Sequence, residues 1–171
     1  LISSQGDVPP LFLTTQEGMI LEHRQYVVAA PPANVFKVFT GLGGEHGWFY
    51  MNWAWEIRGF LDRQIGGVGL RRGRRDPDSL RVGDALDFWR VEAVEPGQLL
   101  RLRAEMKVPG KAWLQFQVTP RDGNQSLLQQ TAYFAPKGLS GWLYWYALYP
   151  LHGLIFSGLI RQIAQRAGAV K

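Results

Sequence analysis

The chain has 171 residues, of which 46% are hydrophobic and 19% charged, and its formal net charge is +5. These values are typical of one globular domain with a sizeable core, and they exclude a disordered or collagen-like chain. The absence of cysteine excludes disulfides, thiolate metal sites and a cysteine nucleophile, and it suits a reducing cytoplasm. The positive charge favours an anionic partner only weakly, because arginines often simply solvate a surface.

The first residues predict a linker rather than a structural element. Residues 1–18 mix Ser, Gln and Gly with the pair Pro9–Pro10, and one domain is predicted over residues 19–171. The first residue is Leu1 and not Met, so we expect the chain to be part of a longer polypeptide. We find no basic segment followed by an apolar run and a small-residue cleavage site, and expect no signal peptide.

A strand and a helix are predicted at the start of the domain. Residues 19–28 carry apolar and aromatic side chains at strand-like positions and predict the first strand. The pair Pro31–Pro32 ends this strand and suits the first turn of a helix. The spacing of Val and Phe then predicts a short amphipathic helix over residues 33–42.

The segment GLGGEHGWFY follows this helix and predicts a loop, because glycine tolerates positive φ. A phosphate-binding dinucleotide fingerprint would need a strand before the glycines, so we favour a plain loop. A second helix is predicted over residues 52–65 and is ended by Gly66 and Gly67. Its apolar residues near helical spacing are Trp53, Ile57, Phe60, Leu61 and Ile65.

A cluster of arginines follows the second helix. Two aspartates, Asp76 and Asp78, lie close behind it and partly neutralise it. A phosphate-binding patch is one interpretation, but we favour a solvated loop. Nucleic acid is not expected as a partner, because a single basic loop lacks the interleaved aromatics of a stacking platform. The arginines are Arg71, Arg72, Arg74 and Arg75.

Four further strands are predicted, separated by clear turn signals. The first covers residues 86–94 and ends at Pro96–Gly97. Residues 99–108 alternate between apolar and charged side chains, which is typical of a half-buried strand. The last two strands cover residues 112–119 and 125–135, with the hairpin signal Asp-Gly-Asn between them.

The C-terminal run from Gly138 to Ala167 dominates the sequence. Its first part, up to Ile160, has no charged residue unless His152 is protonated, and is long enough to span a bilayer. Several glycines, Pro150 and centrally placed tyrosines argue against a membrane span. We predict a long helix of a water-soluble domain, with membrane contact as the alternative. A helix that is apolar on all sides is buried on all sides, so we expect one face to lie on the domain's own sheet and the other to need a further partner.

These elements together predict an α+β fold. A curved antiparallel sheet wrapped around the long C-terminal helix would bury the apolar faces of that helix. The arrangement would leave a cavity between helix and sheet. This is a helix-grip architecture.

Three long segments are similar to a known domain family. They are GGEHGWFYMNWAWEIRGFLD, GLRRGRRDPDSLRVGDALDFWRVEAVEPGQLLRLRAEMKVPGKAWLQF and GLSGWLYWYALYPLHGLIF. They resemble a family of unknown function found C-terminal to NAD(P)-binding Rossmann domains of the short-chain dehydrogenase/reductase type. The resemblance implies the START-like SRPBCC helix-grip fold, whose members often hold apolar ligands under the long helix. It implies no catalytic residue and no cofactor in this chain, with NAD(P) expected in a separate N-terminal domain.

The polar residues give little sign of catalysis. The three histidines are far apart in sequence, so no metal site is expected, and no GxSxG motif supports a hydrolase. We interpret His152 as a core histidine rather than a general base. Glu45 and His46 form a possible acid–base pair at a cavity mouth, but this is the weaker interpretation.

Two groups of polar residues can lie either in the predicted cavity or on the outer face of the sheet. Arg90 anchors a ligand carboxylate or phosphate if it points into the cavity, and forms a surface ion pair with Glu92 if it points out. The glutamines line a ligand site or form the wet face of the sheet, which we favour. These glutamines are Gln115, Gln117, Gln129 and Gln130.

Our leading hypothesis is a non-catalytic domain that binds an apolar small molecule or covers the substrate site of an NAD(P)-dependent oxidoreductase. The alternatives are a docking or homo-oligomerisation module that uses the apolar C-terminal helix, a peripheral membrane contact through residues 142–156, and an independent hydrolase or cyclase, which is the weakest. The residues predicted to contact a ligand are Trp48, Trp89, Arg90, Met106, Phe116, Tyr133, Trp145, Tyr149 and His152.

Overall fold

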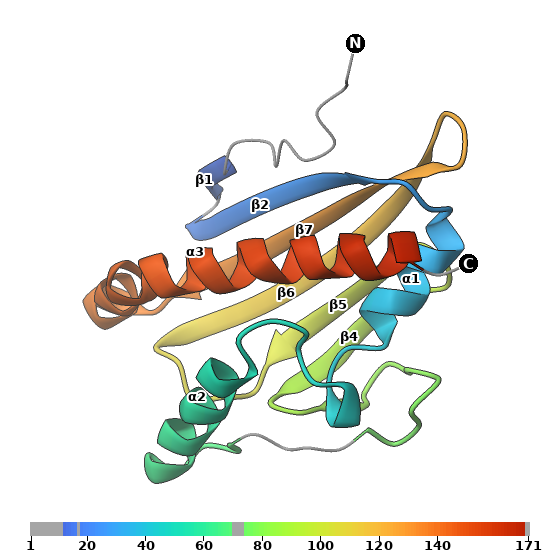
Figure 1. Cartoon of the computed structure of the whole chain (residues 1–171). Helices are drawn as coiled ribbons and strands as arrows, with labels where there is room; N and C mark the ends of the chain where they lie inside the picture. Colours follow the sequence, from blue (N-terminus) through green and yellow to red (C-terminus); the bar gives the residue numbers. More distant parts are fainter. Residues whose placement is uncertain (1–11, 17, 70–73, 170–171) are drawn as a thin grey trace.

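The computed structural model describes residues 12–16, 18–69 and 74–169, and these form one curved antiparallel sheet with α-helices on its inner face (Figure 1). The sheet order is β1-β2-β7-β6-β5-β4-β3. Its strands are β1 (Phe12–Gln16), β2 (Met19–Val28), β3 (Ala85–Leu86), β4 (Trp89–Glu95), β5 (Leu99–Ala104), β6 (Gly110–Arg121) and β7 (Gln125–Pro136). The helices are α1 (Pro32–Thr40), α2 (Asn52–Gln64) and α3 (Gly138–Ala169), with a 3₁₀ turn, η1, at Gly44–His46.

The predicted α+β helix-grip architecture is confirmed, with two corrections: the single strand predicted over residues 86–94 is two paired strands, β3 and β4, and the N-terminal segment adds a strand. The predicted linker over residues 1–18 contains β1, which pairs antiparallel with β2 from Gln16↔Met19 to Phe12↔His23. Five residues of the linker are therefore part of the sheet. Residues 1–11 and 17 of that linker lie outside the described residues.

The alternating strands place the core under α3. In β5, Leu100 and Leu102 are fully buried, whereas Arg101 and Arg103 between and after them reach the outer face. Leu114 and Phe116 of β6 continue the same inner layer, and Phe116 stacks on Phe39 of α1. The predicted alternation of residues 99–108 is confirmed as far as Ala104, where β5 ends.

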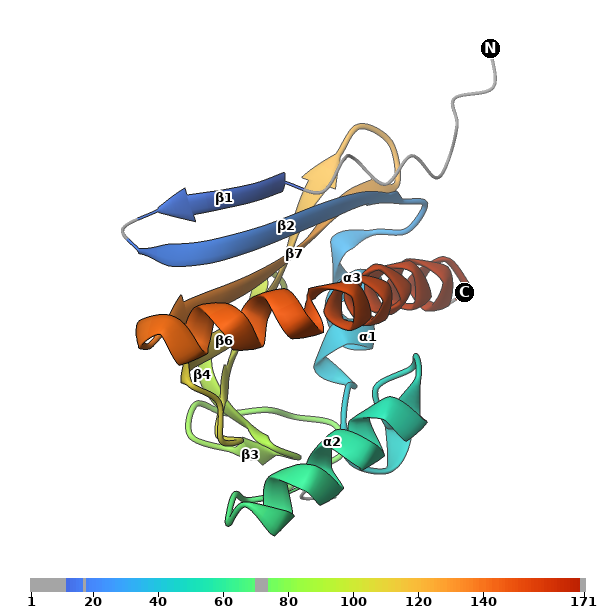
Figure 2. The ribbon, with the colours of Figure 1, turned by 90° about the vertical axis from the view of Figure 1, so that its left-hand side faces the viewer.

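The long helix α3 is bent near its middle. Pro150 lies inside the helix, where it has no N–H to donate to the carbonyl of Tyr146 and its ring crowds that carbonyl. Figures 1 and 2 show the helix axis changing direction between its two halves. The bend gives each half its own packing. The second half covers the main core, and Trp145 of the first half packs with Ile20 and Phe134 in a separate cluster.

Helix α2 ends one residue before the predicted helix over residues 52–65, and the apolar row noted in its sequence faces away from the core. Trp53 is 59% exposed and Phe60 62%, and the other apolar residues of that row are also exposed. Trp55 instead enters the core, where its ring lies against Trp48 and Phe88. The spacing of apolar residues in α2 allows either the side with Trp53 and Phe60 or the side with Trp55 to face the core. The contacts of the Trp55 ring with Trp48 and Phe88 decide for the side with Trp55.

The end of α2 is fixed by a buried carboxylate. Asp62 is 1% exposed, and its two oxygens accept from the backbone N–H groups of Lys107 (2.6 Å) and Gly69 (3.0 Å). Two loops far apart in sequence are therefore held against α2. No helix in the described residues is both long enough and apolar enough to cross a membrane.

Candidate functional site

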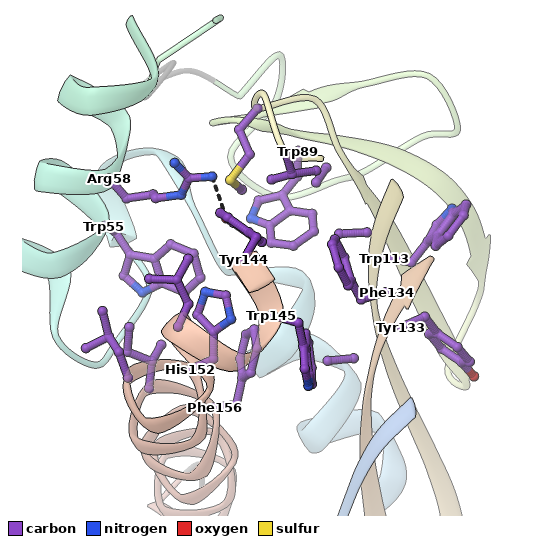
Figure 3. A pocket seen from close by; sticks show the side chains of 18 of the residues that line it. Trp55, Arg58, Trp89, Trp113, Tyr133, Phe134, Tyr144, Trp145, His152 and Phe156 are labelled. Carbon is purple, nitrogen blue, oxygen red and sulfur yellow. Dashed lines mark hydrogen bonds between the residues drawn. The ribbon is translucent and has the colours of Figure 1, made fainter. Parts of the chain in front are cut away.

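A small cavity lies between α2, the bent part of α3 and the inner face of the sheet (Figure 3). Its volume is about 90 Å³. Helix α2 and the first half of α3 form two of its walls, and β4 to β7 with the segment after β5 form the remainder. The lining residues are Ala54, Trp55, Arg58, Trp89, Ala104, Met106, Val108, Ala112, Trp113, Ala132, Tyr133, Phe134, Tyr144, Trp145, Leu148, Leu151, His152, Ile155 and Phe156.

Most of the cavity wall is aromatic or aliphatic. The ring of Trp145 stacks on Phe134, with centroids 5.6 Å apart and planes at 14°. The ring centroid of His152 lies 5.6 Å from that of Phe156 and 6.4 Å from that of Trp145, so the imidazole has an apolar ring on each of two sides. A few polar groups among such apolar walls are the usual composition of a small-molecule site.

Arg58 and Tyr144 form a polar pair on the α2 side of the cavity. Nη2 of Arg58 donates to the hydroxyl oxygen of Tyr144 (2.7 Å) and to the backbone carbonyl of Lys107 (3.3 Å). Its guanidinium carbon also lies 5.6 Å from the Tyr144 ring centroid. Burial raises the pKa of Tyr144, and the positive charge of Arg58 opposes this shift. The tyrosine is therefore a neutral hydroxyl at pH 7.

Three ring nitrogens among the lining residues are buried without a hydrogen-bond partner in the described part of the chain: Nε1 of Trp55, Nε1 of Trp89 and Nδ1 of His152. Burial, with a smaller contribution from the charge of Arg58, lowers the pKa of His152 from 6.5 to about 4. The imidazole is therefore neutral at pH 7. Buried polar groups without partners are rare in native proteins, so these three nitrogens call for an explanation.

Five of the nine residues predicted to contact a ligand line this cavity. They are Trp89, Met106, Tyr133, Trp145 and His152. Figure 3 shows that the side chains of Tyr133 and Trp113 lie on the far side of the strands, so these two residues border the cavity from behind. The inward residue next to Tyr133 is Phe134, because successive strand residues point to opposite faces.

The other four predicted residues lie elsewhere. Trp48 is buried in the core and donates from Nε1 to Asp87 Oδ2 (2.7 Å). Phe116 is fully buried and stacks on Phe39, so it fills the core instead of lining a cavity. Tyr149 packs against the smaller cluster around Trp145, outside the cavity wall.

Arg90 lies on the outer face of the sheet. Its neighbours Trp89 and Val91 are buried, and its guanidinium holds the carboxylate of Glu105 by two bonds of 3.0 and 3.1 Å. The surface alternative is therefore the correct one, but with Glu105 as the partner in place of Glu92. A ligand in the cavity has no access to this guanidinium.

The glutamines divide between the two faces of the sheet. Gln130 is buried under α3, where Nε2 donates to the carbonyl of Phe156 (3.0 Å). Gln129, the next residue in β7, points to the opposite face. The prediction of the outer face is therefore wrong for Gln130, whose hydrogen bond connects α3 to the sheet.

Sequence reasoning missed Trp55, Arg58, Phe134, Tyr144 and Phe156 as cavity residues. Phe134 was recoverable, because the alternation of β7 pairs it with Ala132 on the inner face. Arg58 and Tyr144 carry no sequence signal, since they are 86 positions apart and meet only in the folded chain.

The remaining histidines lie away from the cavity. His46 is exposed in η1 and borders an open groove with Lys37 and Arg166. The side chain of its predicted partner Glu45 lies outside the described residues. His23 Nδ1 is 2.8 Å from Thr131 Oγ1 across β2 and β7. The described residues contain no cluster of His, Asp and Glu that fits a metal ion.

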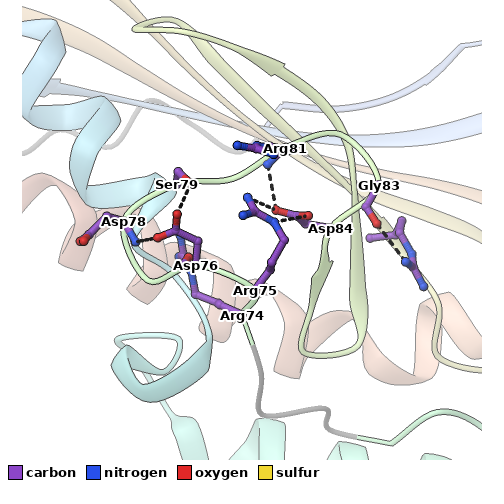
Figure 4. Close-up of polar contacts among 9 residues, drawn as sticks. Arg74, Arg75, Asp76, Asp78, Ser79, Arg81, Gly83 and Asp84 are labelled. Carbon is purple, nitrogen blue, oxygen red and sulfur yellow. Dashed lines mark hydrogen bonds and ion pairs between the residues drawn. The ribbon is translucent and has the colours of Figure 1, made fainter.

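Arg74 and Arg75 of the predicted arginine cluster form hydrogen bonds and ion pairs within the protein (Figure 4). Nη1 of Arg74 donates to the carbonyls of Thr40 (2.6 Å) and Leu42 (2.9 Å), where α1 ends. Arg75 pairs with Asp84 at 3.1 Å. The carboxylate paired with Arg75 is therefore that of Asp84, in place of the predicted Asp76 and Asp78. Arg71 and Arg72 lie outside the described residues.

Comparison with solved structures supports the fold. A truncated norcoclaurine synthase from Thalictrum flavum aligns with a TM-score of 0.55 at 12% identity, over 92% of this chain and 100% of that one. The ZhuI aromatase/cyclase from Streptomyces sp. R1128 aligns with a TM-score of 0.54 at 14% identity, over 87% and 93% of the two chains. Protein CV1439 from Chromobacterium violaceum gives 0.52 at 16% identity, over 91% and 100%.

At these identities the likeness establishes the helix-grip fold alone. No curated protein matches the sequence. A family model described as "Protein of unknown function (DUF2867)" matches residues 16–159. This match covers α2, the part of α3 that lines the cavity and all strands from β2 onwards, so the chain belongs to the DUF2867 family.

Proposed function

We propose that this domain binds an apolar small molecule in the cavity between α2, α3 and the sheet. The observation that carries the proposal is the cavity itself, with apolar walls and a few polar groups gathered around Arg58 and His152. Solved structures of the same fold include a norcoclaurine synthase in complex with a transition-state analogue. That likeness is compatible with small-molecule binding.

The size of the cavity limits the ligand. About 90 Å³ is less than the roughly 300–1,000 Å³ of common ligand pockets. It is also smaller than an engineered cavity of about 150 Å³ that holds benzene. A larger ligand therefore requires an outward movement of α2, whose contacts with the remaining domain pass through Trp55, Arg58 and Asp62. We expect the enclosed part to receive a group no larger than one ring, and a whole ring only when α2 moves outward.

We infer a binding role rather than a catalytic one. A general base works best when its pKa is near the working pH. The pKa of His152 is lowered to about 4, which makes the imidazole a poor proton acceptor at pH 7. Arg58 is a permanent cation, and the cavity lining contains no carboxylate among the described residues. The lining can bind and orient a molecule, but it offers no base suited to neutral pH.

Thermal denaturation with a panel of small aromatic and aliphatic compounds tests the proposal. A compound that binds only the native state at 100 times its Kd stabilises it by about 2.7 kcal/mol. Ala132→Leu should fill the cavity and abolish the shift, because Ala132 is a buried lining residue. Ala147→Leu, at an exposed position of α3, is the matched control and should keep it. Absence of any shift, or equal shifts in both variants, would rule out the proposed site.

Docking of a partner domain is a second candidate function, favoured by the outer face of α2. Its exposed apolar row is Trp53, Ile57, Phe60, Leu61 and Ile65. Ordinary surfaces carry apolar residues singly, whereas these five lie together on one face of the helix. The expected occupant is the NAD(P)-binding Rossmann domain implied by the family resemblance, which stays a prediction.

The state of association of this chain distinguishes the docking candidate from self-association. Sedimentation of the isolated chain should show a monomer if the apolar row awaits a different domain. A Trp53→Gln, Phe60→Gln variant should then lose binding to a co-expressed Rossmann domain of the same polypeptide while keeping its fold. A concentration-dependent dimer abolished by the same variant would instead assign the row to a second copy.

A further inference from the structure

We infer that the ligand of this cavity presents an oxygen that accepts hydrogen bonds, as a carbonyl or carboxylate joined to a ring-sized apolar group. The inference rests on the proposed binding function and adds the chemical class of the ligand. It comes from the polar groups around the cavity, because several of them can donate a hydrogen bond and have no acceptor in the described part of the protein.

The indole nitrogens supply the first argument. Nε1 of Trp55 and Nε1 of Trp89 are buried and have no acceptor among the described residues. An indole N–H can only donate, so each lacks an acceptor in the protein. Leaving a buried donor unpaired is costly, and an acceptor supplied by a ligand removes that cost.

The Arg58–Tyr144 pair supplies the second argument. Nη2 of Arg58 donates to the Tyr144 oxygen, so this hydroxyl already accepts a hydrogen bond. Its own proton remains to be donated, and no acceptor for it is found in the described part of the chain. Figure 3 shows Arg58, Tyr144 and Trp89 converging on the same side of the cavity. These groups offer N–H and O–H donors to one region.

Charge supplies the third argument. Arg58 is a permanent cation, and the lining has no Asp or Glu among the described residues. The buried carboxylate of Asp62 also acts on Tyr144, but Arg58 is the charge that acts on His152, so the potential beside His152 favours a partial or full negative charge and opposes an amine. His152 is neutral and adapts to the ligand, because a neutral imidazole has one donor and one acceptor nitrogen.

Four probes of similar size separate the possibilities. Acetophenone carries a carbonyl, benzoate a carboxylate, benzylamine a cation, and ethylbenzene has no polar group. Their Kd values can be measured by calorimetry with the intact chain. We expect acetophenone or benzoate to bind at least about tenfold more tightly than ethylbenzene, since one buried hydrogen bond is worth about that factor. Benzylamine should bind most weakly.

Matched variants connect the preference to the donors. Trp89→Phe keeps an aromatic ring and removes the N–H, and Tyr144→Phe removes the hydroxyl. Each should weaken binding of the oxygen-bearing probe by about three- to tenfold and leave ethylbenzene unchanged. Trp53→Phe, at an exposed tryptophan of α2 outside the cavity lining, is the control and should change neither. Arg58→Met should affect benzoate more than acetophenone, which separates the anion from the neutral carbonyl.

The outcomes for the ligand class and for the binding function are different. If ethylbenzene or benzylamine binds as tightly as the oxygen-bearing probes, the inferred ligand class is wrong and the binding function stands. Equal losses for oxygen-bearing and plain probes in Trp89→Phe and Tyr144→Phe also overturn it, since they indicate a change of shape. If no probe binds, the proposed function and the ligand class fail together.

Discussion

Glu22 and Arg24, two residues apart on β2, form an ion pair beneath α3 that is almost completely removed from water. Their side chains are 0% and 6% exposed. Arg24 Nη2 also donates to the carbonyl of Gly153 (3.3 Å), which connects the strand to the helix just after Pro150. Burial raises the pKa of Glu22, and the charge of Arg24 opposes the shift. The pair therefore positions the bend of α3 at a cost in desolvation.

Breaking this pair should cost more than replacing it. Glu22→Leu leaves the buried guanidinium without its carboxylate and should lower the free energy of unfolding by about 3–5 kcal/mol. The double variant Glu22→Leu, Arg24→Met removes both charges, and we expect it to be as stable as the wild type or up to about 4 kcal/mol more stable. Urea denaturation of the single and double variants measures this difference. A double variant no more stable than the single one would contradict it.

The stability of the protein should decrease below pH 6.5 because of His152. Its pKa is about 4 in the folded protein and 6.5 without burial, so the unfolded chain binds more protons between these values. The free energy of unfolding therefore falls as the pH falls through this window, by about 3 kcal/mol from this residue. His152→Gln should flatten that part of the profile. Leu154→Gln, at an exposed position of α3, should keep the wild-type slope.

Two glycines of α3 should respond in opposite ways to alanine. A Cβ at Gly158 would overlap the ring of Tyr50, whereas a Cβ at Gly153 would meet its nearest neighbour, Arg24 Nη2, at 3.8 Å. Gly158→Ala should destabilise by about 1–3 kcal/mol through overpacking. Gly153→Ala should stabilise by about 0.5–1 kcal/mol because alanine favours the helix. The midpoint of thermal unfolding, Tm, of the two variants tests both predictions. Equal changes in Tm would show that helix propensity alone determines the effect of alanine.

Loss of the Asp62 carboxylate should release α2. Asp62→Ala leaves the N–H groups of Lys107 and Gly69 without an acceptor, and should destabilise by about 2–4 kcal/mol. Amide hydrogen exchange should become faster at both of these groups. Gln64→Ala, an exposed neighbour in the same helix, is the control and should leave both rates unchanged. Unchanged protection in Asp62→Ala would mean that other contacts hold the two loops.

The strand and helix pattern of this protein was readable in the sequence. Alternation in β5 and the apolar length of α3 depend on local periodicity, and each was predicted with its correct type. β1 was missed because its five residues lie in a segment rich in turn-forming residues. Their strand state depends on pairing with β2, which no local pattern reveals.

The sequence by itself determined the curved sheet, the long helix and the apolar faces that they bury against each other, because these follow from the period of apolar residues along the chain. Only the tertiary structure decided which side of α2 faces the core, that Arg90 points outward, and that Arg58 meets Tyr144 beside the cavity. These orientations depend on contacts between residues far apart in the chain. Such contacts stabilise one orientation only after folding has brought the residues together.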